Sequence, residues 1–559
     1  MKAKRKYKPG WDEILGIALL LLSAGLLAVS VFLCFSDDIW YDELFTMGLA
    51  SQPFGELISI TARDVHPPLY YVIVKLFLIF FRGLGADRWG AAFVSGSGQA
   101  AGPFTLVAAA KLASVLPFFL CLLYGAGKVR RHFGLLAAGL FGFLLLAMPQ
   151  LGGYTVEMRM YGYALFFVTA GMLHAFELAL DAVWDTKRLA GCSKEEADEM
   201  PGQKRKNVLN WTALTLYALG ACYTHYFACV AMVMVYGFLF LSLWKKGGLK
   251  AGWKAFLTSG CLCALAYLPW LVGAVGGQVG QVEENYWIQP VTWRTLGGCV
   301  KFLFQPAFSS EKINLVLAVV LFAICAVLMG QALLRIGRDG ANPFAAGCMG
   351  VLAGIVVFGF AASLVLRPIF VYRYMLPAMG LFWLAFAILL SRLKEKKIVF
   401  FPVFFLLLLV GLRNYRAFYG EEMWKKVRMA QVQEAFSQIG REDALVFNFD
   451  QAQAVVSFYL PNETYLWYGE PEELITEMYP QNHPLVEGEF SDEAGFEALK
   501  GLLGEYERVW FLGSGNARDE IIEKWGKTGI EAQEQDSVML ERYWFNLYQL
   551  EMKEQGQRE

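Results

Sequence analysis

The sequence predicts a polytopic α-helical membrane protein with a C-terminal α/β domain. The chain has 559 residues, of which 56% are hydrophobic and only 18% are charged, a balance too apolar for a soluble protein. Long apolar runs alternate with short basic clusters, which is typical of a chain that crosses a bilayer many times. From about residue 414 these runs stop, and strand-like and helix-like segments alternate instead.

The first apolar run is a membrane anchor by its length and flanks. The basic N-terminus MKAKRKYKPG precedes 23 uncharged residues, Ile14 to Ser36. A cleaved signal peptide would have a shorter apolar core and a cleavage site of small residues. We therefore expect a signal anchor whose N-terminus lies in the cytoplasm, the side on which basic flanks remain.

The next apolar run, Leu69–Phe81, is too short to cross a bilayer. It has 13 residues, including Lys75, whereas a span needs roughly 20. We expect an interfacial helix on the outer face. If this run crossed, the basic cluster Lys128–Arg131 would face outward, against the charge rule.

The remaining runs then predict about eleven spans with basic cytoplasmic ends, which places the C-terminal domain outside the cell. A cytoplasmic loop is expected at 181–210 and an outer loop at 276–312. The predicted spans are 14–36, 104–127, 133–151, 162–180, 211–223, 227–243, 255–275, 313–334, 344–366, 375–390 and 398–412.

Two domains follow from this division. Residues 1–413 are expected to form the transmembrane domain, with a catalytic outer loop and interfacial helices at 36–104, and 414–559 a soluble extracytoplasmic domain. Alternating strands and helices predict an at least partly parallel sheet in the second domain. The strand-like runs are 444–449, 509–512 and 543–550, and the helix-like runs are 424–439, 492–503 and 517–525.

Composition and motifs argue against several other classes. A net charge of −1 and the lack of a basic groove with interleaved aromatics give no sign of nucleic-acid binding. Gly513-Ser514-Gly515 follows a strand but lacks the rest of the G-x-G-x-x-G pattern of dinucleotide sites. Among ten cysteines, Cys261 and Cys263 have no second pair at zinc spacing. We expect small buried thiols and require no cofactor.

Five polar clusters interrupt the apolar segments, and in this topology all of them lie on the outer side. Because the topology was derived from charge and length alone, this coincidence indicates a single outward-facing site. Ionisable residues at the mouth of a span are costly and typically functional. The clusters are Trp40-Tyr41-Asp42-Glu43, Asp64 with His66-Pro67-Pro68, Glu157 to Tyr161, Thr224-His225-Tyr226 and Arg367 to Tyr374.

These residue types fit transfer of a sugar from a phosphate-linked lipid. A carboxylate, Asp42 beside Glu43, is expected to act as general base on an acceptor hydroxyl. Arg159 and Arg373 are expected to bind the phosphate leaving group, which a guanidinium grips through two parallel hydrogen bonds. The remaining candidates are His66, Tyr161, His225 and Tyr374 for donor binding, and Asp64 and Glu157 as orienting carboxylates.

Each assignment has a structural alternative. Asp42 and Glu43 can be a solvated loop pair, and Glu157 and Arg159 can form an ion pair. Arg373 can anchor a span end, as is common for long cationic side chains at a membrane surface. His225 can be a hydrogen-bonded interfacial residue.

Two further residue groups leave their roles open. Asp64, His66 and Glu157 have the ligand types of a divalent metal site, although sequence alone cannot bring them together. Lys111, inside the second span, is expected to extend its amine to the outer surface, with a role in the site as the alternative.

At these clusters the sequence resembles a known family. The motifs are W-Y-D-E, D-V-H-P-P-L-Y-Y, E-M-R-M-Y, T-H-Y and R-Y, in that order over roughly residues 10–415. They look like those of the bacterial relatives of protein O-mannosyltransferases and lipid A aminoarabinose transferases. The resemblance implies a GT-C fold, a polyprenyl-phosphate sugar donor and a multi-pass enzyme of a bacterial plasma membrane. Asp42 matches the catalytic aspartate of the family's Asp-Glu pair, and His66 stands where the aminoarabinose transferases carry lysine.

The function that the sequence favours is inverting transfer of a sugar to an extracytoplasmic acceptor, which is an envelope glycan, a lipid or a protein. One alternative is a transporter or flippase of lipid-linked sugars. Transporters usually show repeated halves and polar or broken helices at mid-membrane, whereas these clusters sit at span ends. A second alternative, a sensor or assembly scaffold, has no need of clustered acids and arginines.

Overall fold

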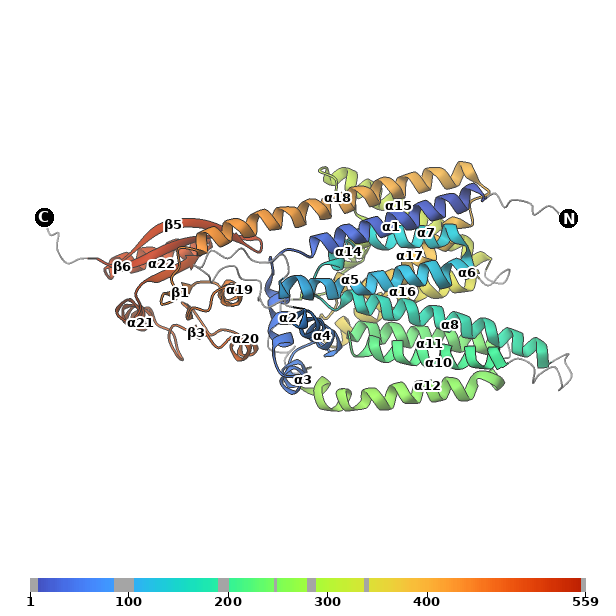
Figure 1. Ribbon diagram of the computed structural model, residues 1–559, viewed down its shortest axis with the longest axis horizontal. Coiled ribbons are helices and arrows are strands. Elements are labelled where there is room, and N and C mark those ends of the chain that lie inside the picture. The colour runs from blue at the N-terminus through green and yellow to red at the C-terminus, as the bar shows by residue number, and fades with distance from the viewer. Residues whose placement is uncertain are drawn as a thin grey trace. The chain divides into compact units, whose positions relative to one another are not determined.

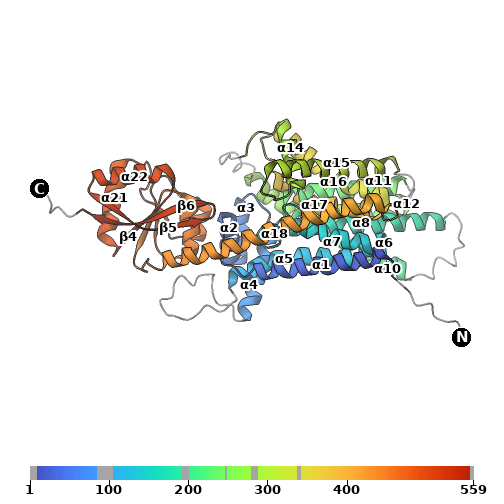
Figure 2. The ribbon, with the colours of Figure 1, turned by 90° about the horizontal axis from the view of Figure 1, so that it is seen from above.

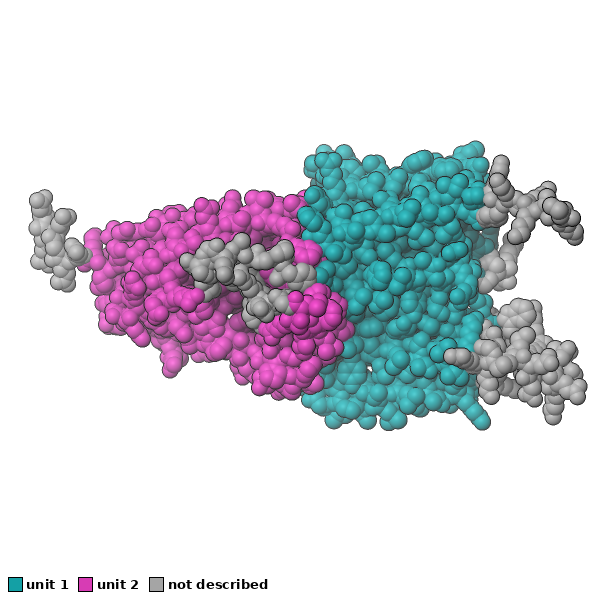
Figure 3. All heavy atoms as spheres, in the orientation of Figure 1, with its two compact units in different colours: residues 1–32, 61–70, 112–419 teal, residues 33–60, 71–111, 420–559 magenta. Residues whose placement is uncertain are grey.

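The computed structural model describes residues 9–84, 105–189, 201–245, 249–278, 288–335 and 341–553. Figures 1 and 2 show that helices make up most of the chain and that the strands all come from its C-terminal part. The chain forms two compact units, coloured in Figure 3. Unit 1 comprises 1–32, 61–70 and 112–419, and unit 2 comprises 33–60, 71–111 and 420–559.

The central element of unit 1 is helix α17 (Leu376–Ser391), in which every residue is buried. It carries no charged residue and packs against α7 (Leu135–Ala147), α8 (Tyr161–Leu189) and α16 (Ala341–Val365). The other helices that lie wholly or mainly in unit 1 are α1 (Trp11–Leu33), α5 (Leu106–Tyr124), α6 (Arg130–Phe133), α10 (Pro201–Cys222), α11 (Tyr226–Lys245), α12 (Leu249–Trp270), α14 (Trp293–Phe304), α15 (Glu311–Leu334) and α18 (Lys397–Phe436).

The prediction of a polytopic helical membrane protein is confirmed. Within the described residues, nine helices are long and apolar enough to cross a membrane. Two predicted spans are not among them, since 133–151 contains the 13-residue helix α7 and 211–223 falls in the second half of α10. The nine are 11–33, 106–133, 161–180, 226–245, 252–278, 311–334, 341–365, 372–391 and 397–436.

Two expected loops prove to be partly helical. The predicted cytoplasmic loop 181–210 is shorter than expected, because α8 continues to Leu189 and α10 begins at Pro201. Both extensions are polar, so they carry no apolar signal although the backbone stays helical. The predicted outer loop 276–312 contains α14, an amphipathic helix with Cys299, Leu303 and Phe304 buried.

A close backbone approach joins the first helix to the third predicted span. A Cβ atom added at Gly16 of α1 would lie 2.6 Å from the backbone of Leu135, and one at Gly139 of α7 would lie 2.4 Å from the carbonyl oxygen of Gly16. Small residues allow such contact between apolar helices, where van der Waals packing drives association. These two glycines therefore set the spacing of α1 and α7.

The last span does not end where the apolar run ends. Helix α18 continues for 40 residues, from Lys397 to Phe436, and includes most of the segment 424–439 that was predicted as a separate helix. The sequence after Gly411 is charged and rich in helix-forming residues, and beyond the apolar run the helix still buries Met429, Val432 and Phe436. The division between the two units falls inside it, between Tyr419 and Gly420.

Unit 2 contains a six-stranded sheet in the order β3-β2-β1-β4-β6-β5. The first four strands in this order are parallel, and β6 pairs antiparallel with both β4 and β5, so the expected partly parallel sheet is confirmed. The strands are β1 (Ala444–Phe447), β2 (Thr464–Leu466), β3 (Asn482–Pro484), β4 (Val509–Gly513), β5 (Ile530–Leu540) and β6 (Tyr543–Met552). The helices of this region are α19 (Asp450–Tyr459), α20 (Glu473–Met478), α21 (Asp492–Glu505) and α22 (Gly515–Lys527).

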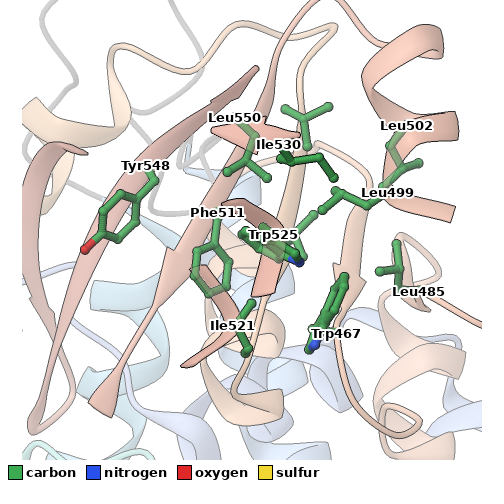
Figure 4. Close-up of a cluster of buried hydrophobic side chains, with 12 residues drawn as sticks. Trp467, Leu485, Leu499, Leu502, Phe511, Ile521, Trp525, Ile530, Tyr548 and Leu550 are labelled. Carbon is green, nitrogen blue, oxygen red and sulfur yellow. The ribbon is translucent and has the colours of Figure 1, made fainter. Parts of the chain in front are cut away.

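Leucine, isoleucine and valine side chains, together with aromatic ones, form a buried core beside this sheet (Figure 4). The ring of Trp525 lies edge-on to those of Trp467 and Phe511, with centroids 5.0 Å and 4.7 Å apart. Each such pair contributes about 0.5–1.5 kcal/mol beyond its buried area. These buried side chains hold the strands and helices of this region together.

The first outer segment forms three helices, α2 (Tyr41–Ser51), α3 (Phe54–Arg63) and α4 (Leu69–Gly83). Helix α4 has 15 residues, fewer than the roughly 20 of a span, and its place at the membrane surface stays a prediction. Residues 85–104 of the predicted catalytic loop lie outside the described chain.

Candidate functional site

Three rings gather around His225 in unit 1. Its ring centroid lies 5.1 Å from that of Tyr374, 5.4 Å from that of Tyr161 and 6.2 Å from that of His66. They come from a short turn before α17, the start of α8 and the segment after α3. The structure therefore brings together four residues that the sequence predicted for donor binding, and we call them the His225 cluster.

Asp64 orients one member of this cluster. Its carboxylate lies 3.2 Å from Nδ1 of His66, and both side chains are largely buried. A carboxylate on one ring nitrogen fixes the tautomer, so that Nε2 is the other functional atom of the imidazole. Asp64 therefore contacts another predicted site residue, and its role as an orienting carboxylate stays a prediction.

His225 is held as a neutral imidazole. Burial, and then the charges of His66, Arg159 and Arg373, keep the pKa of His225 well below its usual range. Its Nδ1 accepts a hydrogen bond of 3.1 Å from the backbone N–H of Phe227. A neutral ring that accepts at Nδ1 carries its proton on Nε2. His225 is therefore both hydrogen-bonded to the backbone and able to donate one hydrogen bond from Nε2.

Arg159, Arg373 and Glu157 all act on the phenol of Tyr154. The phenol of Tyr154 has a pKa well above its usual value, chiefly because of burial and secondly because of Glu157, while Arg373 and Arg159 oppose the shift. The ring of Tyr154 lies 5.3 Å from that of Tyr161. Two guanidinium groups, one carboxylate and the His225 cluster therefore share one partly buried environment in unit 1.

The predicted Asp-Glu pair stands at the start of helix α2 in unit 2. Glu43 is buried, and its carboxylate accepts a hydrogen bond of 3.4 Å from the backbone N–H of Trp40. This contact is one half of a capping arrangement, which gives Glu43 a structural role. Asp42 lies in the first turn, where the helix dipole favours a negative charge.

A buried ion pair precedes this helix. The guanidinium of Arg428 bonds the carboxylate of Asp38, and both residues are buried. Lys111, which was expected to reach the membrane surface, is instead buried and donates a hydrogen bond of 2.7 Å to the carbonyl oxygen of Asp38. The segment before α2 is thus held by two cations.

Several residues around α2 were not found by sequence reasoning. No local pattern marks them, because each belongs to the C-terminal domain, hundreds of residues from its partner in the first outer segment. They are Arg428, Tyr459, Glu472 and Glu541.

The open question of a divalent metal gains no support from geometry. Among the residues that the structure describes, no group of three or more His, Cys, Asp or Glu side chains is arranged to hold a metal ion. Asp64 and His66 instead bond each other.

No protein-family model matches the chain, and no curated protein does. Solved structures do resemble it. ArnT from Cupriavidus metallidurans in the apo state matches with a TM-score of 0.51 and 13% sequence identity, over 96% of this chain and 98% of that protein. The fold of the chain is therefore the GT-C fold of ArnT, as its motifs predicted.

Two more distant matches complete the comparison. ArnT bound to undecaprenyl phosphate gives a TM-score of 0.49 at 13% identity, over 96% of this chain and 99% of that protein. The archaeal oligosaccharyltransferase AglB from Archaeoglobus fulgidus, in complex with an inhibitory peptide and a dolichol-phosphate, gives 0.41 at 11% identity, over 88% of this chain and 69% of that protein.

Proposed function

We propose that this protein is a membrane glycosyltransferase that transfers a sugar from a polyprenyl-phosphate donor to an acceptor on the outer face of a bacterial plasma membrane. Three observations support the proposal: the GT-C fold, the order of the polar motifs along the chain and the chemistry of the His225 cluster. The His225 cluster is the strongest of these observations, because its residues come from separate segments of the chain and lie close together.

The charges around the cluster suit a phosphate leaving group. When the bond between the sugar's anomeric carbon and the donor oxygen breaks, negative charge grows on that oxygen. Arg159 and Arg373 would stabilise this charge through charge-assisted hydrogen bonds. The Nε2–H of the neutral His225 would add a further donor without a competing positive charge.

Asp42 is proposed as the general base. As the acceptor oxygen attacks the anomeric carbon, its proton passes to the Asp42 carboxylate. The phosphate departs with the electron pair of the broken bond. One displacement of this kind inverts the configuration at the anomeric carbon.

The aromatic members of the cluster suit a sugar substrate. Tyr161 and Tyr374 pack beside His225, and rings with a polar hydroxyl at one end suit the edge of a sugar-binding site. The identity of the sugar rests on contacts with its hydroxyl groups, which these residues would supply together with Asp64 and Glu157.

Mass spectrometry of lipid-linked sugars and envelope glycans, from cells with and without the gene, tests this function. We expect cells without the gene to accumulate one polyprenyl-phosphate sugar and to lose that sugar from one envelope component. Accumulation with an unchanged envelope would contradict transfer. Purified protein that moves the donor across a vesicle membrane without releasing polyprenyl phosphate would favour the transporter alternative.

A further inference from the structure

The N-cap residue of helix α2 provides no capping side chain for the first turn. The N-cap residue is Trp40, whose indole has one N–H donor and no acceptor for the free amides of a first helical turn. The backbone N–H of Tyr41 instead donates a hydrogen bond of 2.8 Å to the carboxylate of Glu541. Glu541, a residue of the C-terminal domain, therefore caps α2 at Tyr41. Tyr41 is the residue directly before Asp42.

We propose that Glu541 and Arg428 are positioning residues for Asp42. Through them, the C-terminal domain fixes the first turn of α2 and thereby the direction of the Asp42 side chain. This inference rests on the proposed function, in which Asp42 is the base.

Arg428 bonds both Glu541 and the segment before α2. Its guanidinium bonds the carboxylate of Asp38 and the backbone carbonyl oxygen of Glu541, and it lies over the ring of Trp424 at 4.8 Å. Removing one partner of a buried ion pair leaves the other charge uncompensated. Arg428 thus links the segment before α2 to the turn that carries Glu541.

The backbone before α2 has two further anchors in the same domain. The hydroxyl of Tyr459 donates to the carbonyl oxygen of Asp37 at 2.8 Å and accepts from the N–H of Ile39 at 3.0 Å. The hydroxyl of Tyr41 bonds the carboxylate of Glu472. These contacts hold Asp37, Ile39 and Tyr41, so the start of α2 has little freedom to rotate.

The body of α2 also packs closely on the C-terminal domain. The hydroxyl of Tyr479 donates a hydrogen bond of 3.1 Å to the carbonyl oxygen of Leu44. A Cβ atom at Gly48 would lie 2.8 Å from the sulfur of Met478. The helix is therefore seated along its length as well as capped at its start.

Glu541 itself is held in an unusual backbone conformation. It occupies the turn between β5 and β6 with φ of 53°, a region that residues other than glycine rarely adopt. Such a conformation persists where surrounding contacts fix it. Here the two-residue turn of the β5–β6 hairpin requires a positive φ, and the contacts to Tyr41 and Arg428 hold Glu541 in this turn.

Three variants of the full-length protein in nanodiscs separate positioning from chemistry. Glu541→Ala removes the cap, and Glu541→Gln keeps an acceptor oxygen. Glu523→Ala is a matched control, since Glu523 is exposed and bonds Lys527 within its own helix. Hydrogen exchange of residues 38–46 and release of polyprenyl phosphate are measured in each variant.

We expect Glu541→Ala to speed exchange at the start of α2 and to lower kcat roughly 10- to 100-fold, as for a misplaced catalytic group, with little change in KM for the donor. Glu541→Gln should restore most of both readouts, and Glu523→Ala should match wild type. In an Asp42→Asn background, Glu541→Ala should lower the residual rate no further, because positioning acts through Asp42.

Unchanged exchange in Glu541→Ala would overturn the inference, and so would faster exchange with wild-type turnover. An equal loss of turnover in the Asp42→Asn background would also overturn it, since Glu541 would then act independently of Asp42. If wild-type protein transfers no sugar from any donor, the proposed function fails by itself, while exchange still decides whether Glu541 caps α2.

Discussion

The ring of Tyr374 meets that of His225 edge-on, with centroids 5.1 Å apart and planes at 64°. Tyr374 precedes the wholly buried helix α17, and His225 lies in the turn between α10 and α11. Because a buried helix is fixed by packing on every side, the residues at its N-terminal end have a defined position. The contact shows how the apolar core of unit 1 sets the geometry of its polar end.

Both arginines of unit 1 are expected to be necessary for donor use. Arg159→Ala and Arg373→Ala should each weaken catalysis by about 1.5–3 kcal/mol, the contribution of a hydrogen bond to a charged group, or about one to two decades in rate or affinity. Lysine should rescue only in part, because it lacks the fork of guanidinium. Steady-state kinetics with purified protein and donor check this.

Arg294→Ala is the control for those variants, since Arg294 is exposed in unit 1 and stacks on the neighbouring Trp293. It should behave as wild type. Wild-type kinetics in both of the other alanine variants would remove Arg159 and Arg373 from the site.

His225 should contribute a hydrogen bond and no titration. His225→Asn keeps an acceptor for the N–H of Phe227 but loses Nε2–H, so we expect folding to be retained and turnover to fall roughly tenfold. Burial keeps the pKa of His225 well below its usual range, so we expect its ring not to titrate near neutral pH. The shape of the rate profile between pH 6 and 8 should therefore be the same in both proteins. Loss of an acidic limb in the variant would show that His225 titrates after all.

Glu541 should make stability depend on pH. Burial, opposed by the Tyr41 N–H and reinforced by Asp42 and Asp38, raises the pKa of Glu541 to about 7. A carboxyl whose pKa is raised by folding binds its proton more tightly in the folded state. Its stabilising effect is thus present at low pH and is lost as pH rises through about 7.

Melting of wild type and Glu541→Gln at pH 5.5 and 8.5 checks that sign. We expect wild type to lose on the order of 1–3 kcal/mol relative to the glutamine variant between these values. Equal shifts in the two proteins would assign the pH dependence to other groups.

The topology makes a separate prediction. The first outer segment and the C-terminal domain are expected on the extracellular side, so cysteines at Gly55 and Glu470 should react with a membrane-impermeant reagent on intact cells. A cysteine at Glu395, in a basic segment expected in the cytoplasm, should react only after permeabilisation. Labelling of either outer position from the cytoplasmic side alone would reverse the orientation.

Most spans were predictable, because an apolar run is a local signal and each run needs only its own length to be recognised; the predicted spans 133–151 and 211–223 are the exceptions among the described residues. The limits of α8 and α10 were not predictable, because their polar extensions stay helical without an apolar stripe. The single helix α18 was predicted as two helices, because a charged stretch separates its two apolar parts. Strands β2 and β3 have three residues each, too few to show the alternation that marks a strand.

The candidate site, too, could be predicted only in part. His66, Tyr161, His225 and Tyr374 were predicted because polar clusters stand out between apolar runs, and the structure brings these four together. The partners of α2 could not be predicted. Glu541 lies in a turn of a polar hairpin, and only the folded domain places it at the amide of Tyr41.

The central claim, that Asp42 is the base of a sugar transfer, is tested most directly by the rate of polyprenyl-phosphate release from Asp42→Asn. The substitution keeps the shape of the side chain and removes its proton acceptor. We expect Asp42→Asn to insert and fold normally and to lose turnover by about 10²–10⁴-fold. Glu43→Gln should lose less, because the wild-type carboxylate of Glu43 bonds the amide of Trp40. Wild-type turnover in Asp42→Asn would contradict the central claim.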